Sequence, residues 1–216
     1  MASTTTAQVI IDDAELLLQD ESNDRWSAAE HLAAVNAGMK EICIVKPDAY
    51  ASTGAVTLAK GIVQDLPTGG FQLMEITRNM GVSPGATPGT VIRLMDRRIL
   101  DAMNPSWTSL TASATVEYYM YDERFPLKFS VCPPQPTSAF GYVEMTYAKA
   151  PTVIAADATI LIPDIYRSIL LDYVMFRAFS KDAGHVANLN RASAYESHFG
   201  RALGLRQAKE EQESPK

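Results

Sequence analysis

The stretch PDIYRSILLDYVMFRAFSKDAG, residues 163–184, predicts the central helix of the fold. Plotted at about 100° per residue, its apolar side chains cover most of the helix circumference. They are Ile165, Ile169, Leu170, Tyr173, Val174, Phe176 and Phe179. One narrow polar stripe remains, formed by Asp164, Ser168 and Asp172. Pro163 suits the first turn and Gly184 suits the C-terminal cap. A helix with so little polar surface must pack against neighbours on most sides.

The residues after Gly184 predict another helix, from about 186 to 205, which the short link would fold back antiparallel. Apolar side chains recur on one of its sides, at Leu189, Ala192, Tyr195, Phe199, Ala202 and Leu203. Residues 206–216 have almost no apolar side chains. Such a segment cannot offset the entropy of its own ordering, so we expect a flexible C-terminal tail.

Residues 6–46 predict two further helices at the other end of the chain. The apolar stripe of the first is formed by Val9, Ile10, Ala14, Leu17 and Leu18. The second begins with a capping box, in which the Ser27 oxygen accepts from the Glu30 amide and the Glu30 carboxylate reaches back. Its apolar residues, Leu32, Val35, Met39 and Ile42, recur at helical spacing. Pro47 ends this helix.

Residues 48–159 replace the helical pattern with glycine, proline and an alternation of period two, which is typical of strands. Strands are predicted around Val56 and Leu58, Phe71 to Ile76, Val116 to Met120, Leu127 to Val131, and Val143 to Tyr147. A short helix is predicted from Asp96, its N-cap, to Met103. The proline- and glycine-rich loops 83–89 and 133–141 are expected to protrude.

The segment DLPTGGFQLMEITRNMG, residues 65–81, raises the question of a phosphate-binding loop. A P-loop needs GxxxxGK followed by serine or threonine, and a dinucleotide loop needs GxGxxG at the start of a helix. Neither pattern is present. We therefore interpret Pro67, Gly69 and Gly70 as a hairpin turn before a strand that Arg78 and Asn79 close.

Together these patterns predict the α+β class. Residues 1–47 and 160–205 would form an antiparallel bundle of four main helices. Residues 48–159 would form an antiparallel β domain inserted between the second and third helices, and 206–216 a flexible tail.

Composition excludes several function classes. The 216 residues are 47% hydrophobic and carry a net charge of −6, which disfavours tight nonspecific binding of nucleic acid. There is no uncharged apolar run of the roughly 18 residues needed to cross a bilayer. Asp12 and Asp13 follow a start without basic residues, so we expect no signal peptide. The two cysteines, Cys43 and Cys132, fit a reducing intracellular compartment, although a disulfide stays open.

Candidate catalytic groups are few. His31, His185 and His198 lack metal-ligand spacing, and hydrolase signatures are absent, so we predict no metal, cofactor or catalytic residue. Asp164 and Asp172 could act as paired acid–base carboxylates, but an exposed stripe or partners for Arg167 and Arg177 explain them more simply. The tyrosines of the segment VEYYMYDERFP, at 118, 119 and 121, could stack bases, but without a basic patch they fit a sheet better.

Several segments in fixed order resemble a family of tailed-bacteriophage adaptor proteins from the head-to-tail connector. They are RWSAAEHLAAVNAGMKEICIVKPDA, GIVQDLPTGGFQLMEITRNMG, GTVIRLMDRRILDAMNPSW, YDERFPLKFSVCPPQP, VEMTYAKAP and DIYRSILLDYVMFRAFSKDA. The resemblance covers roughly Trp26 to Leu205. It implies a helical bundle with a β insertion, assembled as a ring under the portal, usually dodecameric. Such a ring extends the DNA channel toward the tail and has no enzymatic activity or cofactor.

The resemblance also implies partners. These are the portal protein, a tail or nozzle protein, copies of the chain itself, and DNA that passes during genome ejection without sequence-specific binding. No membrane is involved, and the protein would reside in the virion, and in the host cytoplasm during assembly, of a phage that we expect to be short-tailed. The C-terminal segment would grip the portal through Leu203, Leu205, Arg206, Lys209 and Lys216. Candidates for subunit or tail contacts are Pro67, Gly69, Gly70, Phe71 and Pro84.

Two alternatives stay open. One is a tail-completion or stopper protein, which would bind tail components and not the portal. The other is a small enzyme that uses Asp164 and Asp172.

Overall fold

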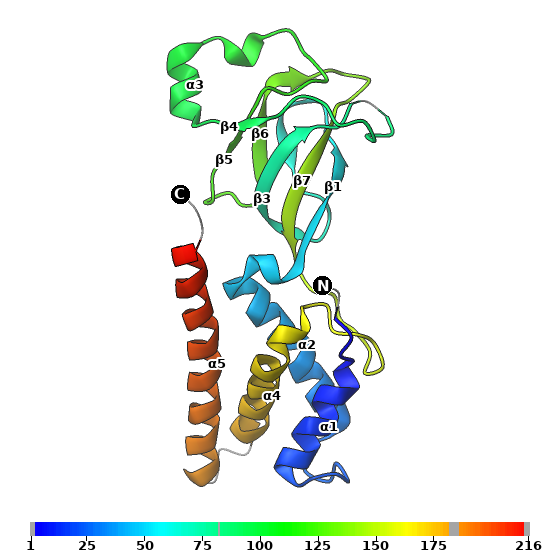
Figure 1. Cartoon of the computed structure of the whole chain (residues 1–216), viewed down its shortest axis with the longest axis vertical. Coiled ribbons are helices and arrows are strands. Elements are labelled where there is room, and N and C mark those ends of the chain that lie inside the picture. Colours follow the sequence, from blue (N-terminus) through cyan, green and yellow to red (C-terminus); the bar gives the residue numbers. More distant parts are fainter. Residues whose placement is uncertain (1–2, 82, 182–185, 214–216) are drawn as a thin grey trace. The chain divides into compact units, whose positions relative to one another are not determined.

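Two compact units make up the chain in the computed structural model, which describes residues 3–81, 83–181 and 186–213, with side chains through Gly204 (Figure 1). Residues through Tyr50 and from Pro151 onward form the helical unit, and Ala51–Ala150 form the β unit. The helical unit is thus built from both ends of the chain, with the β unit inserted between them. The predicted α+β class is confirmed.

Each unit consists mainly of one type of secondary structure. The helical unit contains α1 Ala7–Leu18, α2 Ala28–Val45, the 3-10 turns η1 Pro47–Tyr50 and η3 Asp164–Tyr166, α4 Arg167–Lys181 and α5 Val186–Glu213. The β unit contains β1 Ala51–Thr57, β2 Gly61–Asp65, β3 Gly70–Asn79, β4 Arg93–Leu94, α3 Arg97–Met103, the 3-10 turn η2 Trp107–Ser109, β5 Tyr118–Tyr121, β6 Lys128–Gln135 and β7 Tyr142–Lys149.

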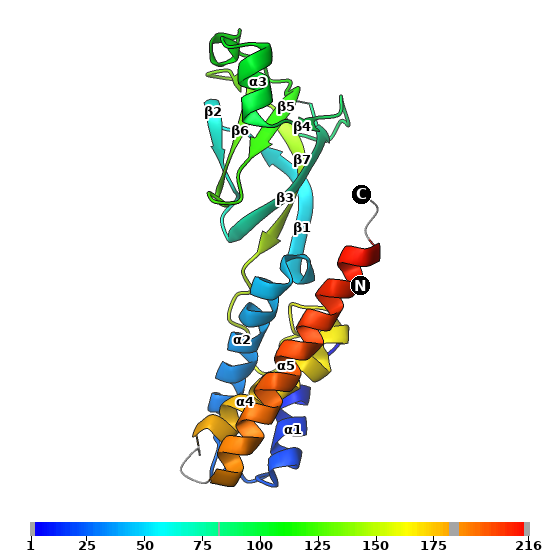
Figure 2. The ribbon, with the colours of Figure 1, turned by 90° about the vertical axis from the view of Figure 1, so that its left-hand side faces the viewer.

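Helix α4 lies at the centre of the helical unit, where it contacts α1, α2 and α5, as predicted for the central helix. Figure 2 shows α5 running alongside α4. Phe179 stacks on Tyr195 with ring centroids 5.9 Å apart, and Tyr173 contacts Phe199 at 5.2 Å. The earlier residue of α4, Tyr173, thus contacts the later residue of α5, Phe199, so the two helices are antiparallel.

The start of α2 is fixed by polar contacts that lie close in sequence. The capping box of Ser27 and Glu30 is present as predicted. The buried Asp20 carboxylate accepts hydrogen bonds from the backbone N–H groups of residues 24, 25 and 26, at 3.1, 3.0 and 2.9 Å. Trp26 then anchors α2 on α4, because its Nε1–H donates to the Ala178 carbonyl at 2.9 Å.

The apolar stripe predicted for the first helix is partly wrong. Ile10 and Ala14 are fully buried together with Ala7 and Ile11, whereas Val9 is 36% and Leu17 55% exposed. The reason is a pairing that is distant in sequence. The N–H groups of residues 7 and 8 donate to the carbonyls of residues 158 and 156, and this pairing sets the side of α1 that faces inward.

The β unit contains two sheets. The first has the order β1-β7-β3 and is antiparallel, and the second has the order β2-β6-β5-β4, in which β4 and β5 are parallel. Their buried faces share one core that includes Leu73, Ile76, Tyr119, Phe129, Val131, Val143 and Met145. Helix α3 begins at the predicted N-cap, since the Asp96 carboxylate accepts from the Arg98 N–H at 2.7 Å. It contributes Leu100 to a second cluster with Trp107, Met120 and Cys132.

The predicted hairpin at Pro67 is wrong, because the strands on either side belong to different sheets. Strand β2 pairs with β6, whereas β3 pairs with β7. The turn itself closes when Gly70 N–H donates to the Pro67 carbonyl at 2.9 Å. Only Gly69 has positive φ there, at +83°. Gly70 is needed for space instead, since a Cβ there would lie 2.8 Å from the Tyr147 ring.

The alternation predicted along residues 71–76 also holds only in part. The register of β3 against β7 shifts at three points, and each shift places two residues of β3 opposite one of β7. Leu73, Ile76 and Asn79 are therefore buried at a spacing of three. In the predicted loop 133–141, residues 133–135 instead continue strand β6.

Helix α5 extends beyond the predicted helix end at residue 205 and reaches Glu213. The Gln, Ala, Lys and Glu residues of this segment are strong helix formers, and an existing helix spares them the cost of nucleation. Lys216 and the predicted cap Gly184 lie outside the described residues.

The close approach of α2 and α4 at Gly38 predicts a large cost for a single methyl group. A Cβ at this position would lie 2.5 Å from Leu170 Cδ1 and 2.9 Å from Tyr173 Cδ1. We expect Gly38→Ala to lower the free energy of unfolding by about 1–3 kcal/mol, as overpacking does. Gly200→Ala, in α5 with open space around it, should raise that energy by up to about 1 kcal/mol. Urea unfolding would measure both, and equal effects would contradict the account.

A buried amide in the β unit predicts a second stability effect. Asn79 Nδ2–H donates to the Val116 carbonyl, and its Oδ1 accepts from the Val116 N–H, both at 2.8 Å. Asn79→Leu leaves both backbone groups without this partner, so the free energy of unfolding should fall by about 3 kcal/mol. Gln72→Leu, on the same strand and half-buried, should change it by less than about 1 kcal/mol. A small effect of Asn79→Leu in urea unfolding would refute this role.

Candidate functional site

Asp164, a candidate acid–base carboxylate, fastens the N-terminal segment to η3. It accepts hydrogen bonds from Ser3 Oγ–H, from Thr4 N–H at 3.1 Å and Oγ1–H at 3.0 Å, and from Thr5 N–H at 3.1 Å. These hydrogen bonds, of which the one from Ser3 has the largest effect, hold the pKa of Asp164 well below its usual range. A carboxylate stabilised in its charged form is a poor general base or acid near neutral pH.

Asp172 has a different partner and does not act with Asp164. Its carboxylate lies 2.9 Å from His198 Nδ1, which joins α4 to α5. Arg167 pairs with Asp13 at 2.6 Å, so the predicted pairing of these aspartates with Arg167 is wrong. The two aspartates of the expected stripe thus contact two different parts of the chain, residues 3–5 and His198, and they do not form a carboxylate pair.

Of the two histidines in the described residues, His198 is exposed and His31 is buried. His31 is 2% exposed, and burial lowers its pKa, which favours the neutral ring. It lines a cavity of about 290 Å³ beside Glu30 and Lys181, whose charged groups pair at 2.7 Å. This pairing lowers the pKa of Glu30 to about 2. His185 lies outside the described residues, and within the described parts no cluster of potential metal ligands occurs.

The tyrosines and cysteines have structural positions. Tyr119 is buried in the core of the β unit, and Tyr121 accepts from Leu73 N–H and donates to the Pro126 carbonyl, both at 3.3 Å. The sheet interpretation of the tyrosines is thus confirmed. Cys43 and Cys132 are both buried and unpaired, and burial raises the pKa of Cys43 to about 12.

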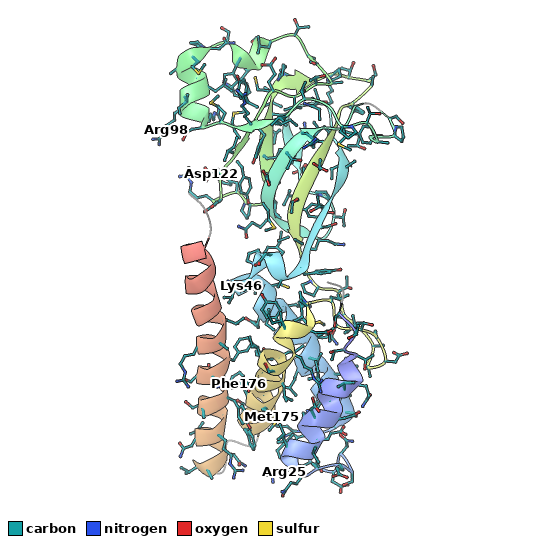
Figure 3. All side chains as sticks on the ribbon, in the orientation of Figure 1. Arg25, Lys46, Arg98, Asp122, Met175 and Phe176 are labelled. Atoms are coloured by element: carbon teal, nitrogen blue, oxygen red, sulfur yellow. The ribbon has the colours of Figure 1, made fainter. Side chains whose placement is uncertain are left out.

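A hollow of about 1150 Å³ in the β unit lies beside α3 and the β5–β6 connection. Arg98 and Asp122 lie at its border (Figure 3). Its charges largely neutralise one another: Arg124 pairs with Asp122 at 2.6 Å and lowers the pKa of that carboxyl to about 2. Paired, exposed charges make a polar surface and do not form an acid–base site.

The candidate contact residues lie at two places in the β unit. At the turn between the sheets, Gly69 is exposed, whereas Pro67, Gly70 and Phe71 are half-buried. Pro84 is exposed and follows a cis peptide bond. The structure thus leaves Gly69 and Pro84 available for contacts.

The C-terminal candidates divide along α5. Leu203 is 2% exposed, so its side chain packs inside the protein and offers little surface. Leu205, Arg206 and Lys209 continue the helical backbone beyond it. In the described residues, no helix has the length and apolar composition to cross a membrane.

Comparison with known proteins identifies the family. A family model described as the SU10 adaptor protein matches residues 5–216. The chain belongs to the SU10 adaptor protein family. A comparison with curated proteins found no match.

Membership in the SU10 adaptor protein family means that the chain is a phage adaptor with a structural role. This is a family of structural proteins and not of enzymes. The expected resemblance to phage head-to-tail adaptors is confirmed over nearly the whole chain. No single motif carried it. The contacts of Asp164 could not be found from local patterns, because its partners, residues 3–5, are distant in sequence.

The Asp164 contacts predict a pH-dependent attachment of the N-terminal segment. Since the pKa of Asp164 is lowered, its contribution is present above the usual aspartate pKa, about 3.9, and is lost as pH falls toward the lowered value. The hydrogen-exchange protection of the Thr4 and Thr5 amides should decrease over that range. Asp164→Asn should reduce it already at neutral pH. Asp157→Asn, an exposed control, should leave the protection of these amides unchanged. Equal protection in the wild type, Asp164→Asn and Asp157→Asn would disprove the attachment.

Proposed function

We propose that the chain is a head-to-tail adaptor that assembles as a dodecameric ring beneath the portal and extends the DNA channel toward the tail. The supporting observation is the family match over residues 5–216. The ring contacts the portal on one side and a tail or nozzle protein on the other. The protein functions in the virion, after assembly in the host cytoplasm.

Helix α5 supports a portal contact near the C-terminus. In the antiparallel pair α4 and α5, Phe179 faces Tyr195 and Tyr173 faces Phe199. Continuing this pairing along both helices places residue 205 opposite Arg167, the first residue of α4. The helical residues after 205 therefore extend past the end of α4. A helix end without its antiparallel neighbour can pack on another protein. Leu205, Arg206 and Lys209 lie in this extension, and Lys216 follows it.

The charge balance supports a passage for DNA. The net charge of −6 disfavours adhesion of the phosphate backbone, which needs lysine and arginine. A conduit must let the genome pass in both packaging and ejection, so weak attraction is an advantage. The exposed Gly69 and Pro84 are candidate contacts to neighbouring subunits or to the tail.

Truncation after Gly204 tests the portal contact. The variant should lose portal binding, because the helical extension is gone, and should keep the unfolding transition of the full chain. Pull-down on purified portal, together with urea unfolding, measures both properties. Undiminished portal binding would contradict the proposed contact.

Leu203→Ala is the matched control for this truncation. Because Leu203 is buried, its loss should lower the free energy of unfolding by about 2–5 kcal/mol. The folded variant should still bind the portal, since the extension is intact. If the chain binds the tail protein and does not bind the portal, it is instead a stopper or tail-completion protein.

A further inference from the structure

The net charge of the protein originates near the N-terminus. Of the 25 acidic and 19 basic residues of the chain, residues 1–50 hold nine and three, so residues 51–216 hold sixteen of each kind. The whole charge of −6 therefore belongs to residues 1–50. Asp12, Glu21 and Asp24 are exposed there. Two copies that met through this surface would repel each other, so a neighbouring copy can contact it favourably only through a different surface.

Helix α1 presents an apolar side chain beside this negative charge. It packs on α2 and α4 with its buried residues, Ala7, Ile10, Ile11 and Ala14. Asp12 and Leu16, one helical turn apart, lie on the opposite side of the helix. Leu16 is 64% exposed. The Asp12 carboxylate accepts a hydrogen bond from Gln8 Nε2–H at 2.7 Å, a neutral donor that does not offset its charge. The outer face of α1 thus combines an exposed leucine with a carboxylate.

The cavity of about 290 Å³ between α2 and α4 has a complementary character. Its described lining comes from α2, α4 and Trp26, and includes no residue of α1. Part of this lining is apolar and buried, at Ala34, Val174 and Ala178. Glu30 and Lys181, which also line it, pair with each other at 2.7 Å. Arg177 is exposed and forms no ion pair with a described residue. The cavity therefore offers space for an apolar side chain next to an unpaired positive charge.

We propose that the outer face of α1 in one copy docks on the α2–α4 cavity of the next copy, with Leu16 in the cavity and Asp12 paired with Arg177. This inference rests on the proposed ring and assigns its subunit contact. The outer face of α1 points away from α2 and α4 of its own copy, so a single copy cannot pair the two surfaces internally. A contact between two different surfaces leaves one of each kind free on every pair of copies, and it closes into a ring where the rotation fits.

Charge complementarity within the chain favours a second copy as the occupant. The cavity has room for an apolar side chain beside Arg177, and Leu16 and Asp12 supply that side chain and the opposite charge at a spacing of one turn. An apolar centre with charged groups at its rim is the usual anatomy of a protein interface. Contact between two α1 faces, or between two cavities, would bring like charges together. The charges thus direct the copies into head-to-tail order.

Charge reversal on each side tests the pairing of Asp12 with Arg177. Asp12→Lys alone places two cations at every contact, and Arg177→Glu alone places two carboxylates there. Each variant should assemble on the purified portal at least about tenfold more weakly than the wild type. An equimolar mixture should recover the full ring mass in light scattering, because alternating copies in an even ring form only lysine–glutamate and aspartate–arginine contacts. A mixture that assembles no better than either variant would overturn the proposal.

Leu16→Ala tests the apolar part of the contact. The variant loses the side chain that fills the cavity, so the chain concentration needed to complete the ring on the portal should rise at least about tenfold. Because Leu16 is exposed in the single copy, urea unfolding should be nearly unchanged. Glu117→Arg, a charge reversal at an exposed residue of the β unit, should assemble as the wild type does. Assembly of Leu16→Ala at the wild-type concentration would refute the docking of this leucine.

Disulfide cross-linking separates this proposal from its alternatives. The free chain with both Leu16→Cys and Ala33→Cys, oxidised at high concentration, should form a ladder of linked copies, because Ala33 lines the cavity. Cys43 and Cys132 are buried and should not contribute. Leu16→Cys alone should stay monomeric, and a dimer would show that α1 meets α1.

The portal is the alternative occupant of the α1 face. If Asp12→Lys prevents portal binding while Arg177→Glu has no effect, α1 contacts the portal and the assigned occupant is wrong. A wild-type chain that forms no ring on the portal while the double cysteine variant forms the ladder would contradict the proposed function and not the contact between copies. Absence of the ladder, both in the free chain and on the portal, would overturn the contact itself.

Discussion

The packing of α4 between α1, α2 and α5 is the constraint on which the rest of the structure depends. It joins segments from the two ends of the chain, and it leaves no room for a side chain where Gly38 meets Leu170 and Tyr173. The insertion is compatible with this packing because β1 and β7, its first and last strands, are paired, with Ala51 opposite Ala148. The chain therefore leaves the helical unit and returns to it at neighbouring points of one sheet.

Features encoded by short-range chemistry could be predicted from the sequence. The capping box of Ser27, the N-cap of α3 at Asp96 and the central position of α4 each follow from spacing within one element. The assignment of strands to sheets could not be predicted from the sequence. The residues of the turn at Pro67 suit a hairpin turn and a connection between two sheets equally well. Bulges in β3 also alter burial without any local sign in the sequence.

The candidate carboxylates illustrate the same limit for function. Spacing placed Asp164 and Asp172 on one helix face, but it did not show that Asp164 accepts hydrogen bonds from residues 3–5 or that Asp172 faces His198. Both carboxylates hold parts of the helical unit together. That use agrees with membership in a family of structural adaptors.

The most direct test of this account is the mass of the purified chain, alone and mixed with its portal, by light scattering, with end views by negative-stain imaging. The account predicts that portal and chain form a complex whose added mass corresponds to one dodecameric ring, visible as a second layer around an open channel. A complex with a few scattered copies, or no complex at all, would contradict the adaptor ring.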